Sequence, residues 1–230
     1  MAYRKKASLI LKFNPDLVIV PECEHPSKLK NIENPTDIIW QGENINKGLG
    51  IFSYNDYKIK LLDVHDLTIK NILPISVTKG SINFLLLAIW AYNPLDRNYN
   101  YIGQVWKAIN LYEKLLKNHN VIIIGDFNSN IFWDKLKRKT NHSMVVEKLA
   151  SLNIFSAYHI HESLEQGKEK HPTFFMYHHE DKPYHIDYCF ASSNFLKNLQ
   201  NFEIGTYQDW SGYSDHTPIT VTFYPGGVFT

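Results

Sequence analysis

The 230-residue sequence predicts an α/β (α+β) fold in one domain over residues 1–230, and three observations support this prediction. Several apolar runs are nearly continuous, which is typical of strands in sheets that are covered on both faces. Segments in which apolar residues recur at helical spacing lie between these runs. The sequence holds no internal repeat, low-complexity tract or linker, so a single core accounts for the whole chain.

The expected elements follow one another from an N-terminal helix. Tyr3, Ala7 and Ile10 share one face of that helix, and the sequence NPD at 14–16 ends it. The next segment, DLVIVPE at 16–22, is typical of a buried strand. Further strands are expected at 48–54, 81–92, 121–128, 184–192 and 217–223, and further helices at 101–118 and 141–152.

Composition and charge exclude several classes of protein. The formal net charge is +1, so no global field attracts nucleic acid or acidic lipid, and any polyanion must bind to a local basic patch. The longest apolar run, FLLLAIWAY at 84–92, is about half as long as a membrane span requires, and the N-terminus lacks the pattern of a signal peptide. Cys23 and Cys189 form no CxxC motif, which is typical of free thiols in a reducing compartment. We therefore expect a cytoplasmic protein with no membrane partner and no obligate protein partner.

Polar side chains gather where the predicted strands end. In α/β sheets, such ends bring side chains from distant segments together into ligand sites. Several carboxylates in one place repel one another, and a divalent cation relieves that repulsion. Oxygen ligands without a cysteine or histidine cage favour Mg²⁺ or Mn²⁺, so the pattern indicates metal-assisted hydrolysis of a phosphate ester. The residues at the strand ends are Glu22, Tyr92, Asp126, Asn128, Asp187, Asp215 and His216.

Several of these residues also have a purely structural interpretation. Glu22 could simply end a strand, and Asp126 with Asn128 could form an Asx-turn. Asp215 and His216 could cap a turn before the last strand. Their occurrence together, in this order and at strand ends, favours a functional site over a series of independent coincidences.

Motifs spread over residues 16–223 resemble the endonuclease/exonuclease/phosphatase family, which includes DNase I-like and exonuclease III-like enzymes. The resemblance rests on VIVPE, GLGIFS, AYNP, IIIGDFN, PTF at 172–174, HIDYCFAS and SDHTPI, in this order. It implies a four-layer sandwich, in which two mostly antiparallel β-sheets pack face to face with helices outside. It also implies a divalent metal cofactor, Mg²⁺ or Mn²⁺.

The resemblance implies roles for the groups around the metal and the attacking water. Glu22 corresponds to the main metal ligand, and Asp215 corresponds to a further acid near the metal. Asp126 corresponds to the carboxylate that orients or deprotonates the water. Asn128 corresponds to the amide that holds the phosphate and the reacting groups in place. The identity of the general base is left open by the sequence.

The same resemblance assigns the groups that handle the phosphate. His216 corresponds to the histidine that binds the scissile phosphate and stabilises charge as the ester breaks. Asp187 corresponds to the carboxylate that hydrogen-bonds this histidine and would keep it protonated. Tyr92 corresponds to a tyrosine that contacts the phosphate.

One part of the family pattern is absent. Family members begin with a strand that bears an asparagine, in a pattern like WNI, before the helix that leads to the glutamate strand. The sequence MAYRKKASLILKF starts in that helix, so the first strand is missing, and its loss would leave an unpaired sheet edge. Either Met1 is an internal methionine of a longer natural protein, or the chain is a truncated member with weakened metal binding.

A basic segment follows the GDFN strand and adds candidate substrate contacts. The segment could bind phosphates beside the site, or it could be a solvated loop. Trp133, just before it, could stack on a base or pack in the core. The basic residues are Lys135, Lys137, Arg138 and Lys139.

These observations favour a Mg²⁺- or Mn²⁺-dependent phosphodiesterase, and within that class a DNA or RNA endonuclease or exonuclease. Nucleic acid is then the expected partner, as the substrate. The near-neutral net charge keeps open a phosphatase or phosphodiesterase for a small molecule or a lipid headgroup. A third alternative is a degenerate, non-catalytic binding module without its first strand, and the intact motifs argue against it.

Overall fold

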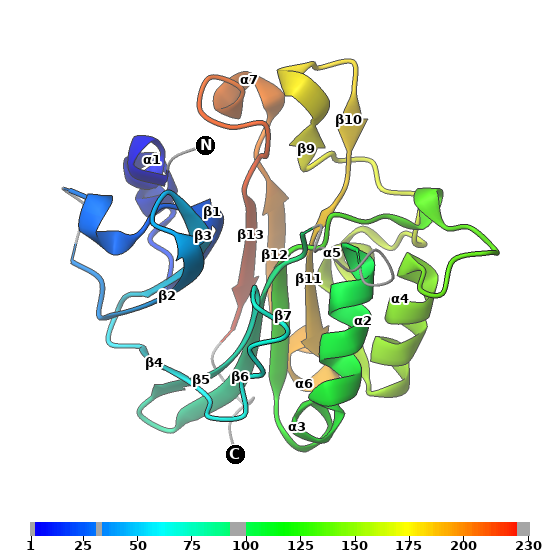
Figure 1. Cartoon of the computed structure of the whole chain (residues 1–230), viewed down its shortest axis with the longest axis horizontal. Helices are drawn as coiled ribbons and strands as arrows, with labels where there is room; N and C mark the ends of the chain where they lie inside the picture. Colours follow the sequence, from blue (N-terminus) through cyan, green and yellow to red (C-terminus); the bar gives the residue numbers. More distant parts are fainter. Residues whose placement is uncertain (1–2, 31–33, 93–99, 225–230) are drawn as a thin grey trace.

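The computed structural model describes residues 3–30, 34–92 and 100–224 (Figure 1). The strands are β1 (Leu17–Cys23), β2 (Asp37–Asn44), β3 (Lys47–Ser53), β4 (Lys58–Leu61), β5 (Ile72–Lys79), β6 (Ile82–Trp90), β7 (Val121–Asp126), β8 (Ile154–Ser156), β9 (Phe174–Phe175), β10 (Pro183–Tyr184), β11 (Asp187–Ser192), β12 (Leu199–Ile204) and β13 (Ile219–Phe223). The α-helices are α1 (Ala7–Ile10), α2 (Ile102–Leu111), α3 (Glu113–Asn118), α4 (His142–Ser151), α5 (Ala157–Glu162), α6 (Ser193–Leu196) and α7 (Tyr207–Trp210). Short 3-10 turns include η1 (Tyr3–Lys5), η2 (Leu11–Phe13) and η5 (Ile131–Trp133).

A six-stranded sheet with the order β4-β5-β6-β7-β11-β8 forms the centre of the molecule. Its neighbouring strands are antiparallel except β6 and β7, which are parallel. A parallel pair needs a crossover, and α2 and α3 lie within the segment that connects these two strands. The side chains of β6 and β7 are mostly buried, because both faces of the sheet are covered.

One face of the large sheet is covered by α2 and α4 (Figure 1). Val105 and Ile109 of α2 lie four residues apart on one face of the helix and join Leu87 and Ile123 from the sheet in a fully buried core. Phe127, the residue directly after β7, is buried in the same core. Packing therefore fixes the chain at the end of β7.

The opposite face of the large sheet packs against two smaller antiparallel sheets. One has the order β1-β3-β2, and the other pairs β12 with β13. Leu49 and Ile51 of β3 join Leu73 and Ile75 of β5 in this second core. Phe202 of β12 belongs to the same core, so both small sheets are anchored on the large one.

A third, smaller core lies on the outer side of the β1-β3-β2 sheet. Tyr3 and Ala7 of the N-terminal segment join Val18 and Phe52 of the strands there. The ring centroids of Tyr3 and Phe52 are 5.0 Å apart. The backbone N–H of Tyr3 also donates to the buried carboxylate of Glu24, at 2.6 Å. These contacts attach the N-terminal segment to β1.

The mixed α/β fold agrees with the prediction, and each predicted strand overlaps a strand of the structure. The segment expected as one strand at 184–192 is divided into β10 and β11, and the helix expected at 101–118 is divided into α2 and α3 at Tyr112. The predicted N-terminal helix is reduced to the single α-helical turn α1 between two 3-10 turns. Among the described helices, none has both the length and the apolar character that crossing a membrane requires.

Candidate active site

Two carboxylates from neighbouring strands meet at one end of the large sheet. Asp126 is the last residue of β7 and Asp187 is the first residue of β11, and the antiparallel register sets them directly opposite each other. Gly125 has a φ of +140°, and a Cβ on it would lie 1.9 Å from the carbonyl oxygen of Ile89 on β6. Only glycine permits this close approach, at the point from which Asp126 projects.

Asp126 is a buried acid in an anionic environment. The residue is 3% exposed. Burial raises the pKa of Asp126 well above its usual value of 3.8, and the charge of Asp187 raises it further. The charge of His216 acts in the opposite direction without cancelling these effects. A buried acid whose pKa is strongly perturbed by specific neighbours is typical of a functional site.

Asn128 holds Asp126 in a fixed orientation. Its backbone N–H donates to Oδ1 of Asp126 at 2.8 Å, and its Nδ2 donates to Oδ2 of Asp126 at 2.6 Å. The same Nδ2 donates to the carbonyl oxygen of Ala91 at 2.8 Å. The backbone of Asn128 is left-handed, with φ +46°, a conformation that asparagine adopts more readily than most residues. The Asx-turn suggested by the sequence is thus present, and it orients the acid.

The imidazole of His216 is paired with Asp187. Its Nδ1 lies 2.9 Å from Oδ2 of Asp187, and its side chain is 30% exposed. Burial opposes a charge on His216, whereas the charge and the hydrogen bond of Asp187 favour it. With further help from Asp126 and Asp215, the pKa of His216 is raised from 6.5 to about 9. The imidazolium is therefore the main form at neutral pH, and it is accessible to a ligand.

Thr173 positions both members of this pair. It is fully buried, and its Oγ1 accepts hydrogen bonds from the backbone N–H groups of Ile186 and Asp187, each at 3.0 Å. Its carbonyl oxygen accepts a hydrogen bond of 2.9 Å from the N–H of Thr217, the residue after His216. Thr173 is the central residue of the PTF motif, so this motif orders the site without contributing a reacting group.

The carboxylate pair and the histidine could hold a metal ion. Ligand atoms of Asp126, Asp187 and His216 lie within 4.8 Å of one another. The proton on His216 opposes ligation by its imidazole, so the carboxylate oxygens are the available donors, and these suit Mg²⁺ or Mn²⁺. The raised pKa of Asp126 shows that the neighbouring protein groups do not fully stabilise its negative charge. A cation beside Asp126 would stabilise that charge.

Glu22, predicted as the main metal ligand, is turned toward Lys47. It lies at the irregular end of β1, where the register shifts between Val20 and Cys23, and its φ is +59°. Its Oε1 is 2.7 Å from Nζ of Lys47, and its side chain is 44% exposed. Glu22 lines the same cavity as Asp126 but is not one of the three residues grouped within 4.8 Å. Its metal-binding role stays a prediction.

Sequence reasoning missed a lysine at this site. Nζ of Lys6, from the N-terminal segment, lies 3.2 Å from Oγ of Ser214, two residues before His216. Burial lowers the pKa of Lys6, although Asp215 and then Asp187 act to raise it. Asp215, predicted as a metal ligand, lines the same cavity. Nothing in the run RKKAS distinguishes this lysine from its neighbours, so no sequence signal marks it.

For the other predicted site residues, the described part of the chain shows no interaction with Asp126 or Asp187. The ring centroid of Tyr92 is 6.0 Å from that of Trp90, and Tyr92 packs against the second core. The ring of half-buried Trp133 lies 5.0 Å from that of Tyr184. The last two residues of the AYNP motif, 93–94, lie outside the described residues. The basic residues between β7 and α4 are all exposed: Lys135, Lys137, Arg138 and Lys139.

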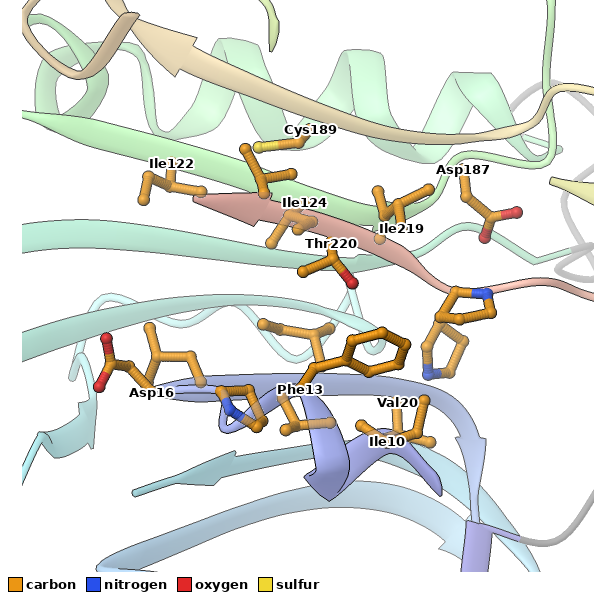
Figure 2. A pocket seen from close by; sticks show the side chains of 18 of the residues that line it. Ile10, Phe13, Asp16, Val20, Ile122, Ile124, Asp187, Cys189, Ile219 and Thr220 are labelled. Atoms are coloured by element: carbon orange, nitrogen blue, oxygen red, sulfur yellow. The ribbon is translucent and has the colours of Figure 1, made fainter. Parts of the chain in front are cut away.

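A cavity of about 510 Å³ extends from the carboxylate pair between β1 and β13 (Figure 2). Ile122 and Ile124 of β7 and Cys189 of β11 line one of its sides. Asp187 lies at one end of the view and Asp16 at the other. We call this cavity, lined along its length by β1 and β13, the interstrand groove. The candidate site lies at its mouth.

The solved structures that share this fold define a class of nucleases and phosphatases. A 3′-5′ exonuclease, NExo, from Neisseria meningitidis matches with a TM-score of 0.67 and 17% identity, over 96% of this chain and 94% of that chain. An AP endonuclease from Archaeoglobus fulgidus matches with a TM-score of 0.66 and 17% identity, over 96% and 95%. An endonuclease/exonuclease/phosphatase family protein from Leptotrichia buccalis matches with a TM-score of 0.61 and 12% identity, over 96% and 92%.

The chain therefore has the fold of the endonuclease/exonuclease/phosphatase family over nearly its whole length, as its motifs predicted. A variant of NExo, described as a 3′ phosphatase and bound to a product DNA hairpin, matches with a TM-score of 0.63 and 16% identity, over 96% of this chain and 94% of that chain. No family model matches the sequence, and no curated protein matches it. Likeness at this identity establishes the fold, so the site residues must carry the argument about chemistry.

Proposed function

We propose that this protein is a divalent-metal-dependent phosphodiesterase that hydrolyses nucleic acid as an endonuclease or exonuclease. One observation carries the proposal: Asp126, Asp187 and His216 bring their ligand atoms within 4.8 Å at the mouth of a groove, in a fold shared with nucleases. Hydrolysis of a phosphate ester needs an activated water and stabilisation of the charge on the phosphate oxygens. This group of residues offers both.

His216 is proposed to bind the scissile phosphate. Its Nδ1 is occupied by Asp187, so the N–H on Nε2 is the donor left for a phosphate oxygen. A charged imidazole stabilises the transition state more than the ground state, because negative charge builds on the phosphate oxygens as the ester breaks. Nζ of Lys6 lies at the same end of the groove and is a second nitrogen donor there.

Asp126 is proposed to orient or deprotonate the attacking water. Its raised pKa makes it a stronger base than an ordinary aspartate. Asn128 acts as a positioning residue, because its side-chain N–H groups are already used to hold Asp126 and the carbonyl oxygen of Ala91. Any contact between Asn128 and the phosphate would therefore be indirect, from its side-chain oxygen through a bridging water.

A bound divalent cation would supply Lewis-acid stabilisation of the phosphate oxygens and would make a bound water more acidic. Asp126 and Asp187 would hold it, and Glu22 and Asp215 line the same cavity as further oxygen donors. A site built from carboxylate oxygens suits Mg²⁺ or Mn²⁺.

Nucleic acid is the favoured substrate for two reasons. The exposed basic segment from Lys135 to Lys139 follows the strand that ends in Asp126, and it offers contacts to phosphates. A DNA hairpin is the product bound by one of the similar structures. A small phosphodiester or a lipid headgroup is the second candidate, because the net charge of +1 provides little general attraction for a polyanion. Metal-dependent hydrolysis of any substrate would exclude a non-catalytic binding module.

We also propose that residues 1–230 form one domain with the four-layer arrangement of the family. Three apolar cores support this arrangement, because they separate the helices α2 and α4, the large sheet, the two small sheets and the N-terminal segment.

The substitutions Asp126→Asn, His216→Ala and Glu22→Ala test the site. We expect each to reduce hydrolysis at least about 100-fold, because each removes a group that acts on the water, the phosphate or the metal. Rates are measured with Mg²⁺ or Mn²⁺ on plasmid DNA, abasic duplex, single-stranded RNA and bis(p-nitrophenyl) phosphate. Chelation by EDTA should abolish them.

The matched control is His119→Ala, because His119 is an exposed histidine just after α3. It should keep the wild-type rate, and all variants should unfold cooperatively in a thermal scan. A His216→Ala protein that hydrolyses these substrates at the wild-type rate would refute the assignment.

A further inference from the structure

The loop between β7 and α4, residues 127–141, carries the two most exposed large apolar side chains among the described residues. Phe132 is 80% exposed, and Leu136, four positions later, is fully exposed. The four basic residues at 135 and 137–139 surround Leu136, and all of them are exposed. The loop extends outward beside α4 (Figure 1). It therefore offers apolar and cationic groups to the same ligand.

Hydrogen bonds from buried and capping side chains anchor this loop on both sides of Phe132. Oδ1 of the buried Asn130 accepts a hydrogen bond of 2.9 Å from the backbone N–H of Phe132. The carboxylate of Asp134 accepts from the first two backbone N–H groups of α4, at 2.7 and 2.9 Å. The side chain of Asn141 makes two hydrogen bonds to the backbone of Lys135, at 3.2 and 3.0 Å. The ring of Phe132 thus reaches solvent from a backbone that is held in place.

A row of aromatic rings connects this loop with the candidate active site. The ring centroid of Phe174 lies 4.7 Å from that of His216 and 6.4 Å from that of Tyr184. The ring of Tyr184 lies 5.0 Å from that of Trp133, the residue next to Phe132. Because Trp133 packs on Tyr184 and is half-buried, Phe132 is the residue of this pair whose ring is free to meet a ligand.

We propose that Phe132 stacks on an unpaired base while the basic residues of the loop bind the neighbouring phosphates, so that single-stranded nucleic acid is the favoured substrate. Sites for single strands combine aromatic rings, on which bases stack, with basic groups that follow the backbone. In a duplex the faces of the bases are covered by their neighbours, so an exposed ring gains little there. The inference rests on the proposed function, in which nucleic acid is the substrate.

An anionic membrane is the competing ligand, because apolar and basic side chains together also bind acidic lipid. The position of the loop favours nucleic acid. A membrane surface would meet Phe132 and Leu136 but would make no use of the rings between the loop and His216. A nucleic acid strand with one phosphate at His216 would pass along these rings and reach the loop.

The probe for this proposal is a fluorescein-labelled oligothymidylate of twelve nucleotides, added to the full chain. Fluorescence anisotropy is measured in EDTA, which prevents metal-dependent hydrolysis, and at a fixed salt concentration. We expect Phe132→Ala to weaken binding of the single strand at least about fivefold, because one base loses its stacking partner. Binding of the same strand paired with oligodeoxyadenylate should change less than about twofold, because phosphate contacts dominate there.

Further variants separate stacking from apolar contact. Phe132→Leu keeps an apolar side chain without an aromatic face and should bind the single strand as weakly as Phe132→Ala. Phe132→Trp keeps an aromatic face and should bind at least as tightly as wild type. The matched control is Tyr224→Ala, which removes an aromatic side chain that is 58% exposed just after β13 and should leave binding unchanged. Ultraviolet crosslinking of the wild-type complex should attach thymine to Phe132, as located by tandem mass spectrometry.

Equal binding of the single strand by wild type and Phe132→Ala would overturn the proposal, and so would wild-type affinity in Phe132→Leu. A wild-type chain that does not bind the single strand would overturn it as well. Vesicles of phosphatidylserine and phosphatidylcholine provide the remaining test. If they sediment the wild-type chain but not Phe132→Ala, while both bind the oligonucleotide equally, the loop is a membrane contact instead.

These measurements do not use hydrolysis, so the two proposals fail separately. Loss of single-strand binding in Phe132→Ala together with full hydrolysis by His216→Ala would refute only the site assignment. Unchanged binding in Phe132→Ala together with loss of hydrolysis in His216→Ala would refute only the stacking proposal.

Discussion

Asp126 and Asp187 are like charges placed opposite each other on neighbouring strands, an arrangement that destabilises a strand pair. Separate contacts offset the repulsion. His216 pairs with Asp187, and Asn128 donates two hydrogen bonds to Asp126. The arrangement therefore makes sense as a site for a cationic or phosphate-bearing ligand rather than as a device for stability.

The first residue-scale prediction concerns the charge on His216. Asp187→Asn removes the charge and the ionic hydrogen bond that raise its pKa to about 9, so we expect that pKa to fall by at least about one unit. The measurement is an NMR titration of the imidazole Cε1–H, with an Asp215→Asn variant for comparison, which should have a smaller effect. An unchanged titration in Asp187→Asn would show that another group charges the histidine.

A second residue-scale prediction concerns His142, which is fully buried at the start of α4. Burial lowers its pKa from 6.5 to about 4. Below pH 6.5 the unfolded chain binds a proton that the folded protein does not bind until about pH 4. The free energy of unfolding should therefore decrease as the pH falls through this window, by up to about 3 kcal/mol.

Urea denaturation of wild type and His142→Asn at pH 7 and pH 4.5 measures this effect. The difference in stability between the two proteins should shift in favour of His142→Asn at the lower pH. His119→Asn changes an exposed histidine and should show the same pH dependence as wild type. An equal change in the free energy of unfolding between pH 7 and pH 4.5 for His142→Asn and wild type would contradict the prediction.

The residues of the candidate site divide into those that the sequence could indicate and those that it could not. Asp126, Asp187 and His216 were predictable, because a polar group at the end of an apolar strand has few structural roles. Lys6 was not, because its contact with Ser214 joins residues 208 positions apart and depends on how the N-terminal segment folds back. The ion pair of Glu22 with Lys47 also follows from a local irregularity in β1 that no motif encodes.

At the scale of elements, the pattern of apolar residues predicted some strands, such as β7, and missed others, such as β2 and β5. β7 is a run of buried apolar residues and was expected at its observed place. β2 is an edge strand with mostly half-buried and exposed residues, so its pattern is weak. β5 contains Pro74, which cannot donate a ladder hydrogen bond and usually argues against an interior strand, yet β5 lies between β4 and β6. Tertiary packing overrides that local signal.

Gly125 provides the element-scale prediction, because it lets β7 approach β6. Gly125→Ala would set a Cβ 1.9 Å from the carbonyl oxygen of Ile89 in a backbone conformation with φ +140°. We expect the free energy of unfolding to fall by at least about 2 kcal/mol, measured by urea denaturation, with loss of activity as Asp126 shifts. Gly212→Ala is the control, since a Cβ there meets nothing within 4 Å. Equal stability of the two variants would disprove the close-approach argument.

At the scale of the whole molecule, the layered arrangement came from the family resemblance rather than from pattern. The pattern of apolar residues indicated an α/β chain but did not indicate which strands share a sheet, because strand pairing depends on contacts between distant segments. The parallel pair β6 and β7 and the separation of β1 from β13 are examples. The net charge of +1 likewise says little about local basic surfaces.

The whole-molecule prediction is about salt. For the Asp126→Asn protein, the logarithm of the binding constant for a DNA duplex should fall linearly as the logarithm of the NaCl concentration rises. The double substitution Lys137→Ala with Arg138→Ala removes two exposed charges, so the magnitude of this slope should decrease by about 1 to 2. Lys58→Ala with Lys60→Ala removes two exposed charges from β4 and should leave the slope unchanged. Equal slopes for both doubles would argue against the basic segment as a DNA contact.

The two cysteines lie in different layers. Cys23 belongs to the outer core beside β1, and Cys189 belongs to the core between the sheets. Burial raises the pKa of each thiol to about 12, so neither thiolate forms appreciably at neutral pH while the layers are closed. The rate at which a maleimide alkylates each thiol thus reports how often the core around that thiol is transiently exposed to solvent. Of the two cysteines, only Cys189 borders the interstrand groove.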